Sequence, residues 1–153
     1  MPFQTYFLKN IEEKAFLIKA LEYSQKRLPL ILNREAINRI KFHKEKNHNL
    51  IIISASPSYW YYDWAYKQGF SKIISTKLEV SDKYFTGKFD GENCTGEEKV
   101  ARLKNEMNFK EYEYTYAYGD SNGDLPLLNF ADESYLKFKR FKWKITFYFL
   151  DQN

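Results

Sequence analysis

Four consecutive apolar residues, Leu50–Ile53, restrict the fold of this chain more than any other feature of its sequence. Three of them are isoleucine, and β-branched side chains favour strands. A strand that is apolar on both faces is typical of a parallel sheet covered by helices on both sides. The small hydroxyl-rich loop Ser54–Ser58 follows directly. Ligands of such sheets bind just outside the carboxyl ends of the strands, so this loop is a candidate binding segment.

A second predicted strand is followed by two carboxylates. Tyr114–Tyr118 is a short β-favouring run, and Asp120 and Asp124 come after it on a glycine-containing loop. Two close Asp side chains both stay ionised only where a cation or hydrogen-bond donors hold them. Oxygen ligands on a short loop suit Mg²⁺ better than Zn²⁺. The simpler interpretation is a surface turn whose Asp side chains cap the next helix.

The composition indicates one soluble domain. The chain has 153 residues, enough to build a core, and its net charge of +4 is too small to indicate nucleic-acid binding by itself. The single cysteine, Cys94, excludes an internal disulfide and fits a reducing compartment. No apolar run is long enough to span a bilayer, and the N-terminus lacks the features of a signal peptide. We therefore expect a cytoplasmic protein.

Periodicity predicts the remaining elements. Helical spacing covers residues 11–25, 33–46, 58–68 and 95–108, and strand-like runs cover 72–76 and 134–138, with a small hairpin at 84–91. Alternating strands and helices after residue 47 predict a three-layer α/β domain. His43 and His48, the only histidines, are expected to be solvated at a helix end.

The helix predicted near residue 95 carries a lysine in its first turn. Thr95 and Glu98 have the spacing of a capping box, so we expect Thr95 to cap this helix. Lys99 falls just beyond, where the positive end of the helix disfavours a cation. A nearby anion would remove that penalty, although a solvated lysine is the simpler interpretation.

Three segments resemble, in order, motifs of the haloacid dehalogenase superfamily in its phosphoserine-phosphatase-like branch. They are Leu50–Pro57, Asn93–Val100 and Gly119–Asp124, which are similar to the second motif, the lysine motif and the acidic motif. Thr76–Val80 followed by Phe85–Gly87 is also similar to this branch. The resemblance implies a Rossmann-like core over residues 33–138, with residues 1–32 as part of a helical cap and residues 139–153 as a basic-aromatic tail.

The resemblance also implies a function and the residues that perform it. The family hydrolyses phosphomonoesters with Mg²⁺ through an aspartyl-phosphate, and the substrate here would be a small phosphorylated metabolite. Ser54 and Ala55 would bind the transferred phosphoryl group, and Lys99 would neutralise it. Asp120 would ligate Mg²⁺, and Asp124 would ligate or support the metal. A non-catalytic phosphate-binding, metal-binding or interaction module of the same fold is the alternative.

One family motif is not found. A strand ending in Asp-x-Asp should supply the nucleophile and the general acid and base. No Asp precedes Asp63, and residues 1–10 contain no such strand. The missing strand would lie centrally, between those that end at Ser54 and Asp120. We therefore expect this chain alone to be inactive: a truncated enzyme, a remnant, or a domain completed by a partner segment.

The tail, residues 139–153, alternates basic with aromatic residues. Such a pattern can bind single-stranded nucleic acid or a membrane surface, but lysines also protect edge strands from aggregation, and we favour the second reading. The apolar run Ile145–Leu150 could enter the central gap and bring Asp151 to the catalytic edge. An exposed or edge-docked tail is the preferred expectation.

Overall fold

A five-stranded sheet forms the centre of the computed structural model, which describes residues 7–137 and 146–152. The strand order is β2-β1-β7-β5-β6. The strands are β1 (Asn49–Ser54), β2 (Lys72–Ser75), β5 (Tyr112–Gly119), β6 (Glu133–Leu136) and β7 (Thr146–Gln152). A separate antiparallel hairpin consists of β3 (Lys77–Ser81) and β4 (Tyr84–Asp90). The strands predicted around residues 50–53, 72–76, 114–118 and 134–138 are confirmed, whereas residues 84–91, predicted to form a hairpin by themselves, contain the single strand β4, which pairs with β3.

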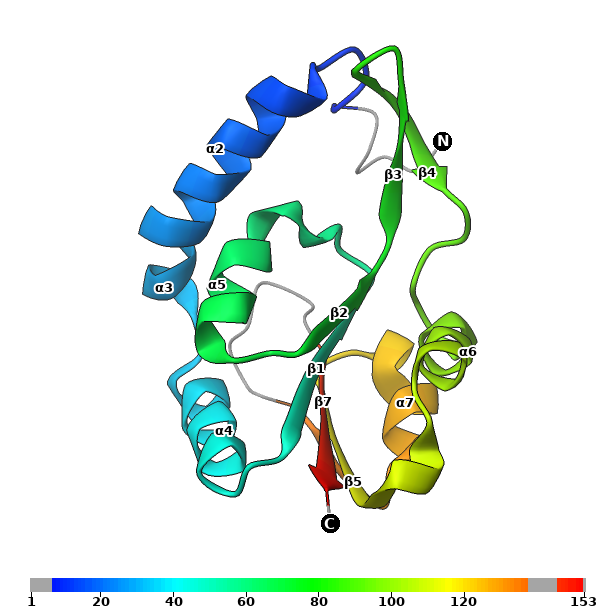
Figure 1. Cartoon of the computed structure of the whole chain (residues 1–153). Helices are drawn as coiled ribbons and strands as arrows, with labels where there is room; N and C mark the ends of the chain where they lie inside the picture. The colour runs from blue at the N-terminus through cyan, green and yellow to red at the C-terminus, as the bar shows by residue number, and fades with distance from the viewer. Residues whose placement is uncertain (1–6, 138–145, 153) are drawn as a thin grey trace.

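Helices lie on both sides of the sheet (Figure 1). They are α2 (Glu13–Lys26), α3 (Leu28–Ile31), α4 (Arg34–Glu45), α5 (Tyr62–Gln68), α6 (Glu97–Glu106) and α7 (Leu125–Phe130), with short 3-10 turns η1 (Ser58–Trp60), η2 (Phe109–Glu111) and η3 (Asn122–Asp124). Leu50 and Ile52 pack in a cluster with α4 and α5, whereas Ile51 and Ile53 pack in another with α6 and α7. The alternation within β1 therefore builds two cores, and the predicted α/β class is confirmed.

The central position of the sheet belongs to β7, from the C-terminal tail. This strand pairs antiparallel with β1, from Thr146 beside Ile53 to Leu150 beside Asn49, and antiparallel with β5 on its other side. The expectation of an edge-docked tail is therefore wrong, and the sheet is mixed rather than parallel throughout. Asp151 pairs with Tyr114, toward the start of β5. The strand direction places Asp151 at the edge opposite Ser54, so the idea that it reaches the catalytic edge is also wrong.

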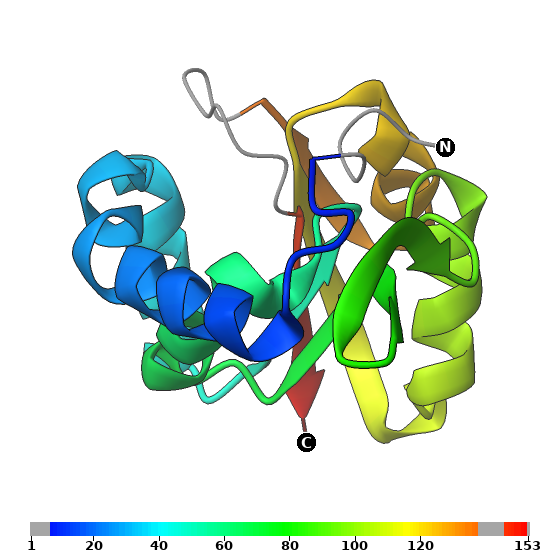
Figure 2. The ribbon, with the colours of Figure 1, turned by 90° about the horizontal axis from the view of Figure 1, so that it is seen from above.

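Helix α2 contacts the body of the protein through one narrow face. Phe16, Ala20 and Ser24 are buried. The ring of Phe16 makes edge contacts with Tyr59, Trp60 and Phe85, which join α2 to the hairpin and to η1. The other side of α2 faces away from the rest of the molecule, at its margin (Figure 2). Ile18 and Leu21, two residues of the helical spacing seen in the sequence, belong to this outer side, whereas Ile11 precedes the helix and its carbonyl accepts from the Phe85 N–H.

His43 lies in the core, not in solvent. Its Nε2 is 3.0 Å from the Tyr118 hydroxyl, and its Nδ1 is 2.7 Å from Nδ1 of His48. The expectation of a solvated histidine is wrong because His43 follows Ala36 and Ile40 at helical spacing on the inward face of α4. Burial, reinforced by the nearby His48 and Arg39, lowers the pKa of His43 to about 3. The folded protein therefore keeps this ring neutral.

A proline in β7 should abolish cooperative folding. Leu150→Pro removes a backbone donor from a strand paired on both sides, where proline is not tolerated. We expect a loss of about 3 kcal/mol or more in the free energy of unfolding, measured by urea denaturation. Lys72→Pro is the matched control. The Ser71 N–H donates to the Leu50 carbonyl in β1. Successive N–H groups of a strand point to opposite sides, so the N–H of Lys72 points away from β1, and proline there removes no hydrogen bond between β1 and edge strand β2. Equal losses in both variants would contradict the central position of β7.

The neutral His43 should make the fold sensitive to acid. Its pKa is below the ordinary value of 6.5, so the unfolded chain binds a proton that the folded chain does not. Its contribution to stability is present above about pH 6.5 and is lost toward about pH 3, at up to about 1.4 kcal/mol per pH unit. In His43→Gln, the free energy of unfolding should depend less on pH between about pH 7 and about pH 4 than it does in the wild type. Urea denaturation at a series of pH values measures this dependence. Parallel curves for both proteins would refute the assignment.

Candidate active site at the carboxyl edge of the sheet

The loop after β1 holds the first predicted site residues. Ser54 is fully buried, and its Oγ accepts a hydrogen bond of 3.0 Å from the Ser56 N–H. The Tyr61 hydroxyl donates to the Ser56 carbonyl at 3.1 Å, and burial raises the pKa of Tyr61 above its usual range. Ala55 is half-buried between them. Side-chain and backbone contacts therefore fix the turn that follows the strand.

A buried ion pair joins this strand to the acidic loop. Lys99 and Asp124 are 2% and 1% exposed, and Nζ lies 2.6 Å from Oδ1. The same Nζ donates to the carbonyl of Ile53, the residue before Ser54, at 3.2 Å. The interpretation of Lys99 as a solvated side chain is therefore wrong. The alternative, a lysine beside an anion, is correct, and the anion is the carboxylate of Asp124. One ammonium group connects the end of β1, the start of α6 and the loop after β5.

The other oxygen of Asp124 organises its own loop. Oδ2 accepts from the backbone N–H groups of Asp120 and Ser121 at 3.1 and 3.0 Å, and from the Ser121 hydroxyl at 2.9 Å. A Cβ on Gly119 would lie 2.6 Å from Cβ of Asp124, so only glycine fits there. Asp120 is half-buried with its Oδ1 covered. Asp124 is thus held at Oδ2 by three donors from two residues, in addition to the contact of Lys99 with Oδ1.

The lysine motif begins its helix differently from the prediction. The N-cap of α6 is Gly96, at φ 58°, rather than Thr95, and no side chain caps this helix. The Gly96 N–H instead donates to the Gly123 carbonyl at 3.0 Å. A Cβ on Gly123 would lie 2.8 Å from the Thr95 Oγ1. The close approach of two loops, not a local capping box, therefore determines where α6 starts.

Several of these residues line a cavity of about 950 Å³, whereas Ser54 and Asp120 are not part of its wall. Its wall on the motif side contains Ala55, Ser56, Lys99, Ser121 and Asp124. The opposite wall comes from α2, η1 and the hairpin, with Lys19, Ala20, Tyr23, Trp60 and Phe89. The cavity therefore has a polar end containing a buried cation and an aromatic end beneath α2.

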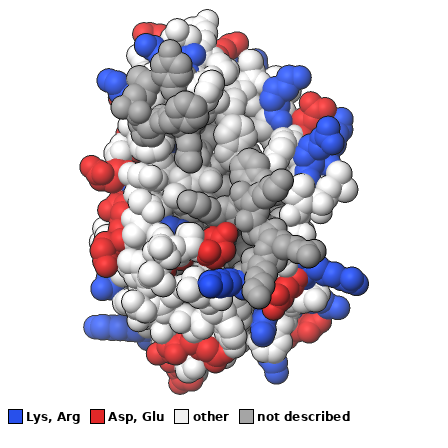
Figure 3. Space-filling model, turned by 180° about the vertical axis from the view of Figure 1, so that it is seen from behind, with Lys and Arg blue, Asp and Glu red and all other residues white. Residues whose placement is uncertain are grey.

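Seen from behind, basic and acidic side chains are interspersed over the surface of the molecule (Figure 3).

The model of the haloacid dehalogenase-like hydrolase family matches residues 6–129. The chain belongs to this family. It is 32% identical over 128 residues to Protein CicA of Caulobacter vibrioides, which covers 83% of this chain and 57% of CicA. It is 30% identical over 100 residues to a histidinol-phosphatase of Neisseria meningitidis serogroup C, covering 61% of this chain and 45% of the phosphatase.

A solved structure confirms the fold of this haloacid dehalogenase-like chain. It is a protein of unknown function from Bordetella pertussis Tohama I, with a TM-score of 0.73 and 22% sequence identity, over 86% of this chain and 61% of that one. The chain spans about half the length of the curated relatives it matches. The family is therefore established, while the phosphoserine-phosphatase-like branch stays a prediction.

In this haloacid dehalogenase-like domain, the metal prediction rests on two carboxylates. Among the residues that the structure describes, no group of three or more His, Cys, Asp or Glu side chains could hold a metal ion. Asp124 is committed to Lys99 and to its loop, which leaves Asp120 as the carboxylate at this edge suited to a metal. Mg²⁺ is commonly held by one or two carboxylates together with substrate phosphate and water. The donor chemistry therefore fits Mg²⁺, with phosphate as a co-ligand.

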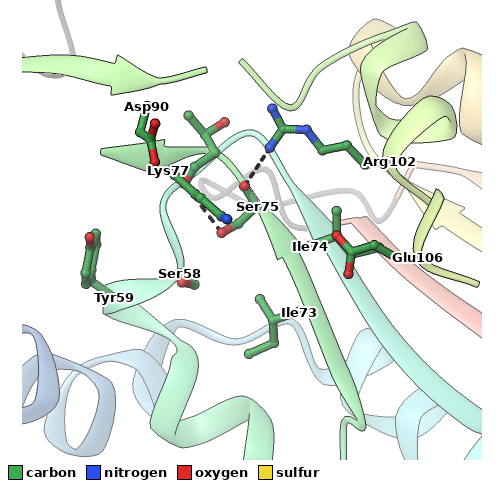
Figure 4. Close-up of a pocket in the computed structure, with 10 residues that line it drawn as sticks. Ser58, Tyr59, Ile73, Ile74, Ser75, Lys77, Asp90, Arg102 and Glu106 are labelled. Atoms are coloured by element: carbon green, nitrogen blue, oxygen red, sulfur yellow. Dashed lines mark hydrogen bonds between the residues drawn. The ribbon is translucent and has the colours of Figure 1, made fainter. Parts of the chain in front are cut away.

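A second cavity of about 500 Å³ lies beside β2 and shows what positions α6 (Figure 4). Arg102 donates to the carbonyls of Ser75 and Glu92 at 2.9 and 2.5 Å and to the Glu98 carboxylate at 2.6 Å. These contacts fasten α6 to the end of β2. Lys77, Asp90 and Glu106 also line this cavity, so its wall carries both signs of charge. We read Arg102 as a structural clamp.

Sequence reasoning missed several contributors to the site. Ser121 and Asp124 form the capping box of η3, and their spacing is the signal that could have identified Ser121. The Ile53 carbonyl and the Arg102 clamp have no local sequence signal. Cys94 is buried, and burial raises the pKa of its thiol, which disfavours the reactive thiolate form. None of the described helices is long and apolar enough to cross a membrane.

The buried pair should show strong coupling. Lys99→Met or Asp124→Asn leaves one uncompensated charge or donor in the interior, and each should cost about 3 kcal/mol. The double variant buries no charge and should cost at least about 1.5 kcal/mol less than the sum of the two. Urea unfolding of the four proteins measures the coupling.

The exposed pair Lys41–Glu45, at 3.8 Å, supplies a matched control cycle. Its coupling should not exceed about 0.5 kcal/mol. Additive effects of the Lys99 and Asp124 substitutions would show that the two side chains do not depend on one another in solution.

Proposed function

We propose that this chain carries the phosphate-binding and metal-binding part of a phosphomonoesterase site that acts on a small phosphorylated metabolite. The observation that carries the proposal is the buried Lys99–Asp124 pair at the polar end of the 950 Å³ cavity, next to the loop that begins at Ser54. A buried lysine beside hydroxyl and amide donors matches what a phosphoryl group requires. The phosphatase relative in Neisseria supports the same class of reaction.

Each predicted site residue has a place in this proposal. Ser54 brings a hydroxyl and Ala55 a backbone amide to the turn after β1, while Lys99 supplies the positive charge. Asp120 would hold Mg²⁺, which when bound adds positive charge at the phosphoryl oxygens. Asp124 positions Lys99 and the Asp120 backbone, since its carboxylate already accepts from both. We assign the chain to the phosphoserine-phosphatase-like branch on the same motifs.

Turnover also needs a nucleophile. In the proposed chemistry a carboxylate attacks phosphorus, the leaving oxygen takes a proton from a general acid, and water then cleaves the aspartyl-phosphate. Asp151, the acidic residue of β7, lies at the opposite edge of the sheet. We therefore propose that this chain alone binds phosphate without hydrolysing it, and that a partner segment would have to supply the nucleophile.

A non-catalytic module is the second candidate, and the position of β7 favours it. The place between β1 and β5 is filled by a strand that runs antiparallel to both. Such a domain would retain ligand binding and lose chemistry. Both candidate functions are compatible with the predicted division into a cap over residues 1–32, a core and a tail. Both also keep the expectations of a cytoplasmic location and of no nucleic-acid partner.

Inorganic phosphate with Mg²⁺ should bind the chain in a calorimetric titration. Ser54→Ala and Lys99→Met should each weaken phosphate binding by about tenfold or more, since each removes a donor to the anion. Asp120→Asn should remove the enhancement that Mg²⁺ gives, while phosphate alone still binds. Lys104→Met is the matched control, because Lys104 Nζ lies over the ring of Phe130, 4.7 Å from its centre.

Two results would contradict the proposal. One is the absence of phosphate binding by the folded wild-type chain, with or without Mg²⁺. The other is rapid hydrolysis of an aryl phosphate by the chain alone that persists in Asp151→Asn, because it would require a nucleophile that we have not identified. Thermal melts of every variant establish that the folded protein is being titrated.

A further inference from the structure

Helix α2 is apolar on two sides, and only one of them is covered. Phe16, Ala20 and Ser24 face the body of the protein. The uncovered side, here the outer stripe, consists of Leu17 (42% exposed), Ile18 (62%) and Leu21 (45%). Isolated exposed leucines are ordinary, but a contiguous apolar stripe along one helix marks an interaction surface. Figure 2 shows that no described element lies over this side of α2.

The charges around the stripe are arranged symmetrically. Lys14 precedes Ile18 by four residues, and Glu22 follows it by four. Residues four apart lie on the same side of a helix, so both charges flank Ile18 on the outer side. When a second α2 lies antiparallel with the two Ile18 residues opposite each other, each Lys14 meets a Glu22. The same register sets Ala15 opposite Leu21.

We propose that two copies of this chain associate through the outer stripe, with their α2 helices antiparallel and Ile18 near the two-fold axis. A two-fold interface uses one patch twice, so the patch has to complement itself. The outer stripe does so around Ile18, because Ile18 meets Ile18 and Leu21 meets Ala15, with one flanking cation and one flanking anion on each copy. Glu22 already pairs with Lys26 at 3.0 Å, and a carboxylate can accept from two cations.

This register identifies the second copy as the occupant in preference to other partners. A nucleic acid or an acidic membrane would need a surface of one sign, and Glu22 opposes both. A helix of an unrelated protein would have no reason to place its charges four residues on either side of an apolar centre. The interface is small, so a modest affinity is expected.

Charge exchange tests the proposal. Sedimentation of the whole chain, whose monomer mass is 18.4 kDa, should show a reversible dimer. Lys14→Glu and Glu22→Lys should each weaken it by about tenfold, because each change brings like charges together twice. The double variant K14E/E22K restores both pairs and should return to within about threefold of the wild type. Ile18→Asp should give a monomer.

Matched changes on α4 control for charge and exposed apolar area. Lys41→Glu and Glu45→Lys alter an exposed pair of the same kind, and Phe42→Asp alters a side chain 42% exposed; all should leave the dimer unchanged. Circular dichroism shows that each variant is folded. A wild-type monomer up to about 0.2 mM would overturn the proposal. So would a dimer that survives Ile18→Asp, or single-charge losses that the double variant does not repair. Phosphate binding plays no part in these outcomes.

Discussion

The carboxyl edge of this sheet depends on the ion pair between Lys99 and Asp124. Removing both charges from water costs several kcal/mol per ion, and their attraction offsets this only if other hydrogen bonds complete the pair. Here the Ile53 carbonyl completes the ammonium group, and three donors complete the carboxylate. The pair therefore persists only while β1, α6 and the loop after β5 keep their relative positions. This arrangement holds the Lys99 ammonium group in one place at the carboxyl edge of the sheet.

The direction of β7 follows from where the chain leaves β6. Leu136 pairs with Gly119, so β6 ends at the same edge as Ser54. Thr146, the first residue of β7, lies beside Ile53, at that same edge. A parallel strand would require a crossover of a dozen or more residues, whereas an antiparallel strand needs only a short return. Because β7 lies between β1 and β5, the backbone N–H and carbonyl groups that these two strands turn toward each other find hydrogen-bond partners in β7.

The sequence predicted most elements because their signals are local. Leu50–Ile53 carries its own β-branched pattern, and Asn33 accepts from the Glu35 N–H as an N-cap should. The errors arose where distant segments decide the outcome. Gly96 replaced Thr95 as the cap because Gly123 approaches it, and Lys99 is buried because the distant Asp124 lies beside it. The Ser54, Lys99 and Asp120 motifs were found in order, but their convergence depends on sheet topology, which no single motif contains.

Helix α2 connects the cavity to the outer surface. Lys19, Ala20 and Tyr23 line the aromatic end of the cavity, and Ile18 and Leu21 belong to the outer stripe, so neighbouring residues of one helix serve both. A helix contacted on a single face is free to shift about that face, because few packed side chains oppose the motion. A second copy on the outer stripe would oppose it. Self-association would then fix the wall of the cavity opposite Lys99, and so couple the oligomeric state to the shape of the space that a ligand enters.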